Sequence, residues 1–267
     1  MLVDSHCHLD RLNLDHFNND LRACLAFARK HDVFHFLCVC IDLTHFPAVL
    51  AIAEQFKDVS ASVGVHPTES LREEVRLTEL IQLAQHPKVV AIGETGLDYY
   101  HDTTRKECQQ ERFRQHIRAA IAVNKPLIVH TRHAREDTLN ILREEGAQHV
   151  GGVLHCFTED LSMAESAIKE NFYISFSGIL TFKNAIELKA IAQRLPLEYL
   201  LIETDSPYLT PHPFRSKPNQ PAYVRYVAEC LAQLRRCSFD KIAEQTTANF
   251  FTLFKQAQCG NSFIEDN

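Results

Sequence analysis

Short apolar runs alternate with longer amphipathic stretches along most of the chain, and this alternation constrains the fold more than any other feature. The amphipathic stretches repeat apolar residues at spacings of three and four, as in QQERFRQHIRAAIAVN and LSMAESAIKEN, which is typical of helices that cover a sheet. Such a pattern predicts parallel strands joined by right-handed crossovers. Eight units favour an α/β fold of the (β/α)8 TIM-barrel type, which takes about 250 residues. The strands are expected at 2–7, 35–41, 60–65, 89–94, 126–130, 152–156, 172–176 and 199–204.

The 267 residues contain no low-complexity linker, internal repeat or compositional break, so we expect one barrel domain over 1–267. The segments VRYVAECLAQLRR and TTANFFTLF have the periodicity of closing helices, and 258–267 are expected to form a loose C-terminal tail. The proline-rich stretch 211–221 follows the last strand. We expect it to be an ordered loop on the active face, because proline restricts the backbone there.

Single polar residues close several of the apolar runs. His6 and His8 are two residues apart at the end of the first run, so both imidazoles project from one side of the strand. In a barrel the carboxyl ends of all strands open onto one face, whereas an open doubly wound sheet would have to gather its ligands at one switch point. The sequence therefore predicts a metal site made of residue types that bind divalent cations: His6, His8, Glu94, His130, His155 and Asp205.

Each of these residues also has a simpler interpretation. A single histidine at the end of a strand is more often a hydrogen-bonded side chain than a ligand, and the chain has 15 histidines. Glu94 could cap the turn in GETG, and Asp205 could be the N-cap in DSP. The metal hypothesis depends on six residues at corresponding positions and not on any one of them.

Composition narrows the class of protein further. Nine scattered cysteines without a CxxC pair fit reduced thiols better than a disulfide framework or a zinc ribbon. No apolar stretch reaches the roughly 18 residues of a membrane span, so we expect a soluble, cytoplasmic protein with no membrane association and no obligate protein partner. A formal net charge of −6 argues against a broad basic nucleic-acid surface, although a local site could still bind phosphate.

Six sequence blocks closely resemble those of the TatD family of metal-dependent hydrolases and nucleases. They span essentially the whole chain in the family's order: SHCHLD at 5–10, GVHP at 64–67, GETGLDYY at 93–100, KPLIVHTR at 125–132, LHCF at 154–157 and ETDSPYL at 203–209. The resemblance implies a barrel of the metallo-dependent hydrolase type with two divalent ions per subunit. Glu94 would bridge an ion held with His6, His8 and Asp205 and a second ion held with His130 and His155.

Two positions depart from the family's common pattern. His133 stands where aspartate often follows HTR or HSR, and Arg215-Ser216-Lys217 stands where RGK is common. Neither departure touches a proposed ligand. Both could alter substrate positioning, so activity levels are not carried over from relatives.

The proposed ligands have a chemistry that can be argued separately. Imidazole and carboxylate groups without thiolates suit Zn²⁺, Mn²⁺, Co²⁺ or Ni²⁺, whereas Mg²⁺ would prefer more oxygen ligands, so the identity of the metal stays open. Two cations about 3.5–4 Å apart could activate a bridging water and stabilise the attacking and leaving oxygens of a phosphodiester. Besides Glu94, we expect Asp205 to act as general base and His66 to orient the scissile phosphate, although His66 equally suits a structural hydrogen bond.

Substrate-binding residues are less clear from the sequence. Arg132, Arg215 and Lys217 are expected in loops at the mouth, where they would bind phosphate, yet each also fits ordinary solvated charge. Tyr99 and Tyr100 could stack on a base or pack over the rim of the barrel.

The leading hypothesis is a TatD-type deoxyribonuclease that hydrolyses phosphodiester bonds of DNA, single-stranded or at ends, as an exonuclease. The alternative is an ester or amide hydrolase, such as a D-aminoacyl-tRNA deacylase. A third possibility is a non-catalytic metal-binding or nucleic-acid-binding barrel, against which the intact ligand set argues. Phosphotriesterase-like or dihydroorotase-like chemistry is less favoured, because those barrels commonly bridge their metals with a carbamylated lysine where this chain has Glu94.

Overall fold

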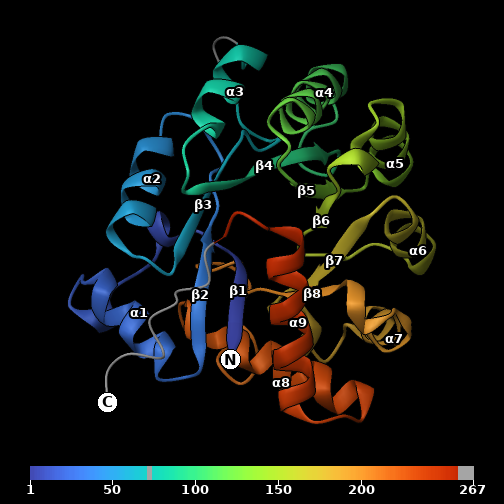
Figure 1. Ribbon diagram of the computed structural model, residues 1–267. Coiled ribbons are helices and arrows are strands. Elements are labelled where there is room, and N and C mark those ends of the chain that lie inside the picture. Colours follow the sequence, from blue (N-terminus) through green and yellow to red (C-terminus); the bar gives the residue numbers. More distant parts are fainter. Residues whose placement is uncertain (71–73, 258–267) are drawn as a thin grey trace.

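Eight parallel strands follow one another in sequence order around a single sheet in the computed structural model, which describes residues 1–70 and 74–257 (Figure 1). Helices alternate with the strands on the outside of the sheet, so the predicted (β/α)8 barrel is confirmed. The strands are β1 (Leu2–Cys7), β2 (Val33–Cys38), β3 (Val59–Val63), β4 (Val89–Asp98), β5 (Leu127–Arg132), β6 (Gly152–Leu154), β7 (Phe172–Phe176) and β8 (Leu200–Ile202).

The helices also follow the predicted stretches, although their ends differ. The helices are α1 (Leu21–Arg29), α2 (Phe46–Gln55), α3 (Leu77–Ala84), α4 (Lys106–Val123), α5 (Arg135–Glu144), α6 (Leu161–Lys169), α7 (Ile186–Arg194), α8 (Val224–Arg235) and α9 (Phe239–Leu253). Helices α4 and α9 begin earlier than predicted, whereas α6 and α8 end earlier. The first helix begins directly after Asp20, because the Asp20 carboxylate caps it by accepting a hydrogen bond from the Arg22 N–H at 2.8 Å. The expected loose tail at 258–267 lies outside the described residues.

The barrel closes at its active face through the segment that follows β8. The Asp205 N–H donates to the His6 carbonyl at 2.9 Å, the His8 N–H donates to the Ser206 carbonyl at 2.8 Å, and Cys7 and Ser206 form a parallel bridge. Since β8 itself ends at Ile202, these bonds join the two ends of the sheet. They place Asp205 next to His6 and His8, about two hundred residues away in the chain.

Strand β4 is longer than predicted. It continues to Asp98 and pairs with β5 as far as Arg132, so the expected ends at 94 and 130 were wrong. Gly96 allows the two strands to approach there, because a Cβ at this position would collide with the carbonyl oxygen of His130. Glu94 therefore projects from the interior of a strand and not from its end, and His6 likewise lies within β1.

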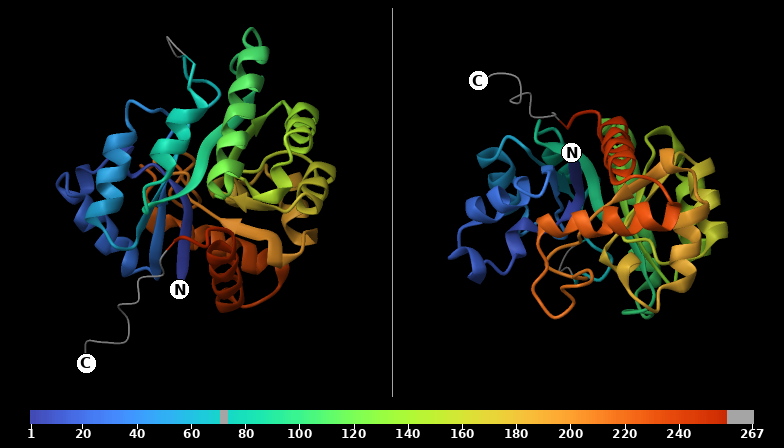
Figure 2. Two further views of the ribbon diagram at one scale, coloured as in Figure 1. Left: turned by 45° about the horizontal axis from the view of Figure 1, so that its top comes forward. Right: turned by 90° about the horizontal axis from the view of Figure 1, so that it is seen from below.

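Helix α9 closes the opposite end of the barrel. Its Phe250 and Leu253, with Phe254 directly after it, belong to one buried cluster with strand residues such as Val3 and Leu201. In both views of Figure 2, α9 lies on the same side of the barrel as the N-terminus, where β1 begins. The carboxyl ends of the strands therefore lie at the other end of the barrel from this apolar cluster, where a functional site can form.

Two further expectations concern thiols and membranes. The eight cysteines in the described part of the chain are free, in agreement with the absence of a disulfide framework. Among the described residues, no helix has both the length and the apolar character needed to cross a membrane.

Candidate metal centre

One group of four side-chain atoms gathers where β1 meets the segment after β8. His6 Nε2 and His8 Nε2 lie 3.4 Å apart. Glu94 Oε2 is 3.4 Å from the His6 nitrogen and 3.9 Å from the His8 nitrogen, and Asp205 Oδ1 is 3.7 Å and 3.4 Å from them. Ligand atoms of a tetrahedral ion with bonds of about 2.1 Å are about 3.4 Å apart. These four residues therefore fit a single divalent ion.

A second group surrounds the other oxygen of Glu94. Glu94 Oε1 lies 3.3 Å from His130 Nδ1 and 2.7 Å from His155 Nε2. His155 Nε2 is buried without a hydrogen-bond partner, although the carboxylate oxygen is so near. A buried nitrogen that faces a carboxylate without a hydrogen bond fits a ligand of a shared cation. Glu94 turns one oxygen toward each group, which is the arrangement that a bridging carboxylate requires.

Outer hydrogen bonds orient two of these imidazoles. His8 Nδ1 lies 3.0 Å from the Val39 carbonyl oxygen, and His130 Nε2 lies 3.0 Å from Asp98 Oδ2. Each oxygen accepts a hydrogen bond from one ring nitrogen and leaves the lone pair of the other nitrogen directed at the cluster. Asp98 is itself held by the backbone N–H groups of Tyr100 and His101.

His66 approaches the second group in a different role. The Thr68 N–H donates to His66 Nδ1 at 3.2 Å, so the proton of the neutral ring is on Nε2, which lies 3.3 Å from Glu94 Oε1. His66 is thus arranged as a hydrogen-bond donor rather than as a ligand. Burial lowers the pKa of His66, and the Glu94 carboxylate opposes this in part.

The electrostatics of the cluster favour a bound cation. Burial opposes the ionisation of Glu94, yet the His155 and His66 imidazoles hold its pKa well below the usual range. Asp205 is also buried, and His8 and His6 lower its pKa. The His155 pKa is raised well above its usual value, because the effect of burial is outweighed by Glu94 and a second carboxylate. A divalent ion would take the place of that proton.

Two side chains that contact imidazoles of the cluster were missed by sequence reasoning. Asp98 orients His130 as described, and Glu203 Oε1 lies 3.3 Å from His155 Nδ1. Both are fully buried. Their spacing from predicted ligands could have identified both residues. Glu203 stands two residues before Asp205, the same spacing as between His6 and His8, and Asp98 follows Glu94 by four residues.

The cluster forms the floor of an open cavity of about 800 Å³ at the carboxyl ends of the strands. Arg11, Arg132 and Arg135 line this cavity. Arg11 pairs with Asp42, and Arg135 pairs with Glu159. Within the described part of the chain, Arg132 has no carboxylate at ion-pairing distance, so its charge is available to a ligand.

The structure separates the other predicted substrate-binding residues from this cavity. Arg215 does not line it, since its guanidinium lies 3.6 Å over the Phe182 ring and donates to the Thr210 carbonyl. Lys217 is also absent from the lining, with its ammonium 5.3 Å over the Phe214 ring. Their part in substrate binding stays a prediction.

The two adjacent tyrosines have different environments. The Tyr99 hydroxyl donates to Asp137 Oδ2 at 2.8 Å, and its ring packs against the barrel with 8% exposure. Tyr100 is 55% exposed, and the Arg132 guanidinium lies 4.0 Å over its ring. Only Tyr100 is therefore open to a ligand at the rim.

Comparisons with known proteins agree with this geometry. The family model described as TatD related DNase matches residues 3–255. The uncharacterized metal-dependent hydrolase YcfH of Escherichia coli is 48% identical over 253 residues, 95% of each chain. YabD of Bacillus subtilis, named in the same way, is 43% identical over 96% of this chain and 99% of its own length. The crystal structure of YjjV, a TatD homologue from Escherichia coli, matches with a TM-score of 0.88 and 30% identity, over 95% of this chain and 98% of that one. The chain therefore belongs to the TatD family and is a metal-dependent hydrolase.

Proposed function

We propose that the protein is a deoxyribonuclease that hydrolyses phosphodiester bonds at the ends of DNA or in single-stranded DNA. The observation that carries the proposal is the position of Glu94, whose two oxygens face two separate sets of imidazoles on the floor of an open cavity. Two divalent ions bound there would supply the positive charge that activates water and stabilises a phosphodiester transition state. Arg132 adds an available cation at the same mouth.

Three residues of the chain would accept the proton of the attacking water, donate a hydrogen bond to the phosphate and bind a neighbouring phosphate. Asp205 lines the cavity with a lowered pKa, so its carboxylate is ready to accept a proton from the attacking water. His66 holds a proton on Nε2 and would donate it as a hydrogen bond to a phosphate oxygen. Arg132 would hold a neighbouring phosphate with its planar fork of donors.

The proposal includes the expectations that follow from this activity. DNA is the partner, no obligate protein partner is required, and the reduced cysteines fit a cytoplasmic enzyme. The bound pair of ions would be drawn from Zn²⁺, Mn²⁺, Mg²⁺, Co²⁺ and Ni²⁺.

The test is hydrolysis of an end-labelled single-stranded oligonucleotide. Protein stripped with a chelator is reloaded separately with Mn²⁺, Zn²⁺, Co²⁺, Ni²⁺ or Mg²⁺, and labelled products are mapped over time. We expect stepwise release of nucleotides that depends on the added metal and is abolished by excess chelator. A D-aminoacyl-tRNA substrate is assayed in parallel. Its hydrolysis by a protein that releases no nucleotide with any metal would overturn the proposal in favour of a deacylase.

A further inference from the structure

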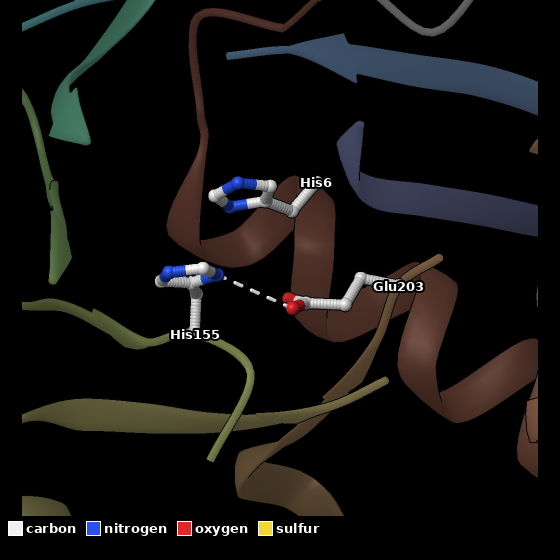
Figure 3. Close-up of side chains that lie close together, drawn as sticks. All are labelled: His6, His155 and Glu203. Atoms are coloured by element: carbon white, nitrogen blue, oxygen red, sulfur yellow. Dashed lines mark hydrogen bonds and ion pairs between the residues drawn. The ribbon is translucent and has the colours of Figure 1, made fainter. Parts of the chain in front are cut away.

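Beneath the candidate metal centre, three buried side chains form a cluster that the proposed mechanism does not use as a unit: His6, His155 and Glu203 (Figure 3). One ligand atom from each lies within 4.8 Å of the others. The His6 and His155 rings stack at 3.9 Å between centroids with an interplanar angle of 10°. Glu203 approaches from the segment after β8, and its side chain is 0% exposed.

This cluster does not have the chemistry of a third ion site. The Nε2 atoms of His6 and His155 both face Glu94, one in each group of the metal centre. A third ion at Glu203 would therefore require both nitrogens of each ring, and hence two doubly deprotonated imidazoles. The cluster is better understood as the support of the two rings.

Glu203 contacts the two residues that follow β6 through a single oxygen. Its Oε1 lies 3.3 Å from His155 Nδ1 and accepts a hydrogen bond from the Cys156 N–H at 2.8 Å. Cys156 has φ of 43°, a left-handed conformation that costs a residue with a Cβ free energy. The Glu203 carboxylate thus holds both the His155 imidazole and the backbone turn at Cys156, and this turn directs the imidazole into the cavity.

The second oxygen of Glu203 and the second nitrogen of His6 have no partner. Glu203 Oε2 and His6 Nδ1 are both buried without a hydrogen bond in the structure. Unpaired buried polar atoms are costly and are retained where they serve a site. In this cluster they lie beside one imidazole from each group of the metal centre.

We infer that Glu203 is a positioning residue of the metal centre, which orients His155 directly and His6 through the stacked rings. The inference rests on the metal centre of the proposed function and not on the choice of DNA as substrate. A carboxylate behind an imidazole fixes the tautomer and makes the ligating nitrogen more basic, and loss of such a partner typically weakens metal binding about 10- to 100-fold.

The test measures Co²⁺ binding to the full-length chain, by competition with a chelator and by the visible absorption spectrum of bound Co²⁺. Glu203→Gln keeps the shape and one acceptor but removes the charge, and Glu203→Ala removes both. We expect the weaker of the bound ions to lose about 10-fold or more in affinity in Glu203→Gln, with a larger loss in Glu203→Ala. The spectrum is expected to change in both variants.

A matched control is Asp4→Asn. Asp4 is an equally buried acidic side chain, and burial raises its pKa to about 8. It accepts hydrogen bonds from the Thr204 N–H and hydroxyl at 2.8 and 2.6 Å and bonds no imidazole ring in the described residues. This variant should lower the Tm and leave the Co²⁺ affinity and spectrum unchanged. If Glu203→Ala does not fold, the more conservative Glu203→Gln still decides the question.

The same substitution made in the His155→Ala variant distinguishes a role in positioning His155 from general support of the fold. In His155→Ala, the ring through which Glu203 acts is absent, so adding Glu203→Gln should change Co²⁺ affinity less than about twofold. Equal losses in both backgrounds, or wild-type affinity and spectrum in Glu203→Gln, would overturn the inference. A wild-type chain that binds no Co²⁺ would overturn the metal centre and the inference together. Normal Co²⁺ results without DNA hydrolysis would overturn only the deoxyribonuclease.

Discussion

Glu94 Oε1 and His155 Nε2 lie 2.7 Å apart inside the barrel, and yet the nitrogen has no hydrogen-bond partner. The other nitrogen of the His155 ring faces Glu203. A carboxylate oxygen and an imidazole nitrogen at this separation need a positive charge between or beside them, because two lone pairs otherwise repel. The chemistry of the centre depends on this relationship.

Replacement of Glu94 by glutamine should remove the proposed pair of metal ions. The amide has nearly the same size, but it lacks the charge that faces the two sets of imidazoles. We expect turnover to fall by more than about 100-fold. Mutation of a residue that only hydrogen-bonds a metal ligand already lowers metal affinity or activity by about 10- to 100-fold. Metal content by elemental analysis and nucleotide release from single-stranded DNA measure the effect. Glu165→Gln, on the exposed face of α6, is the control. Full turnover in Glu94→Gln would refute the bridging assignment.

His66→Ala should separate catalysis from metal binding. Because His66 carries its proton on Nε2, it is expected to donate to the phosphate and not to ligate an ion. The turnover number should fall by about 100-fold, as on removal of one donor to a transition-state oxyanion. The metal content should stay at the wild-type value. Loss of an ion from this variant would instead identify His66 as a ligand.

Arg132→Ala should weaken substrate binding at the mouth of the cavity. Arg132 stacks on the exposed Tyr100 and has no carboxylate partner in the described residues, so its charge is free to meet a phosphate. A hydrogen bond to a charged group contributes about 1.5–3 kcal/mol, which corresponds to a fall in kcat/KM of about 10- to 100-fold. The salt dependence of KM should also become shallower. Arg143→Ala, a half-exposed arginine that pairs with Glu170, should change neither quantity.

The stability of the fold should fall in acid because of buried neutral histidines. His116 accepts a hydrogen bond from the Val65 N–H and donates to the Arg112 carbonyl, and burial lowers its pKa from 6.5 to about 4. The unfolded chain binds the extra proton first, so this stability is complete above pH 6.5 and is lost as pH falls toward 4. The loss for one such group is about 3 kcal/mol.

Urea unfolding of wild type and His116→Gln at pH 7.5, 5.5 and 4.5, with a chelator present, measures this dependence. The variant should be less stable at pH 7.5 and should lose less stability on acidification. His35, whose pKa is also lowered to about 4 by burial, remains in both proteins and cancels in the difference. Parallel pH profiles of the two proteins would contradict the assignment to His116.

Most of the ligand geometry could be anticipated from the sequence because it follows from position along a strand. His6 and His8 share a face through their spacing, and parallel strands bring His130 and His155 to the same end of the barrel. The sequence could not predict the extension of β4 to Asp98, which depends on the approach of β5 over Gly96. Nor could it predict that Arg215 packs on Phe182, outside the cavity.

The sequence by itself determined the order of strands and helices, the family, and the set of residues able to bind cations, because periodicity and residue type are local properties. Only the tertiary structure decided that Glu94 divides its oxygens between two groups, that the Asp205–Ser206 segment closes the barrel against β1, and that Asp98 and Glu203 lie against the outer nitrogens of His130 and His155. These relationships join atoms from distant parts of the chain. They are set by side-chain rotamers and barrel closure, which no local pattern contains.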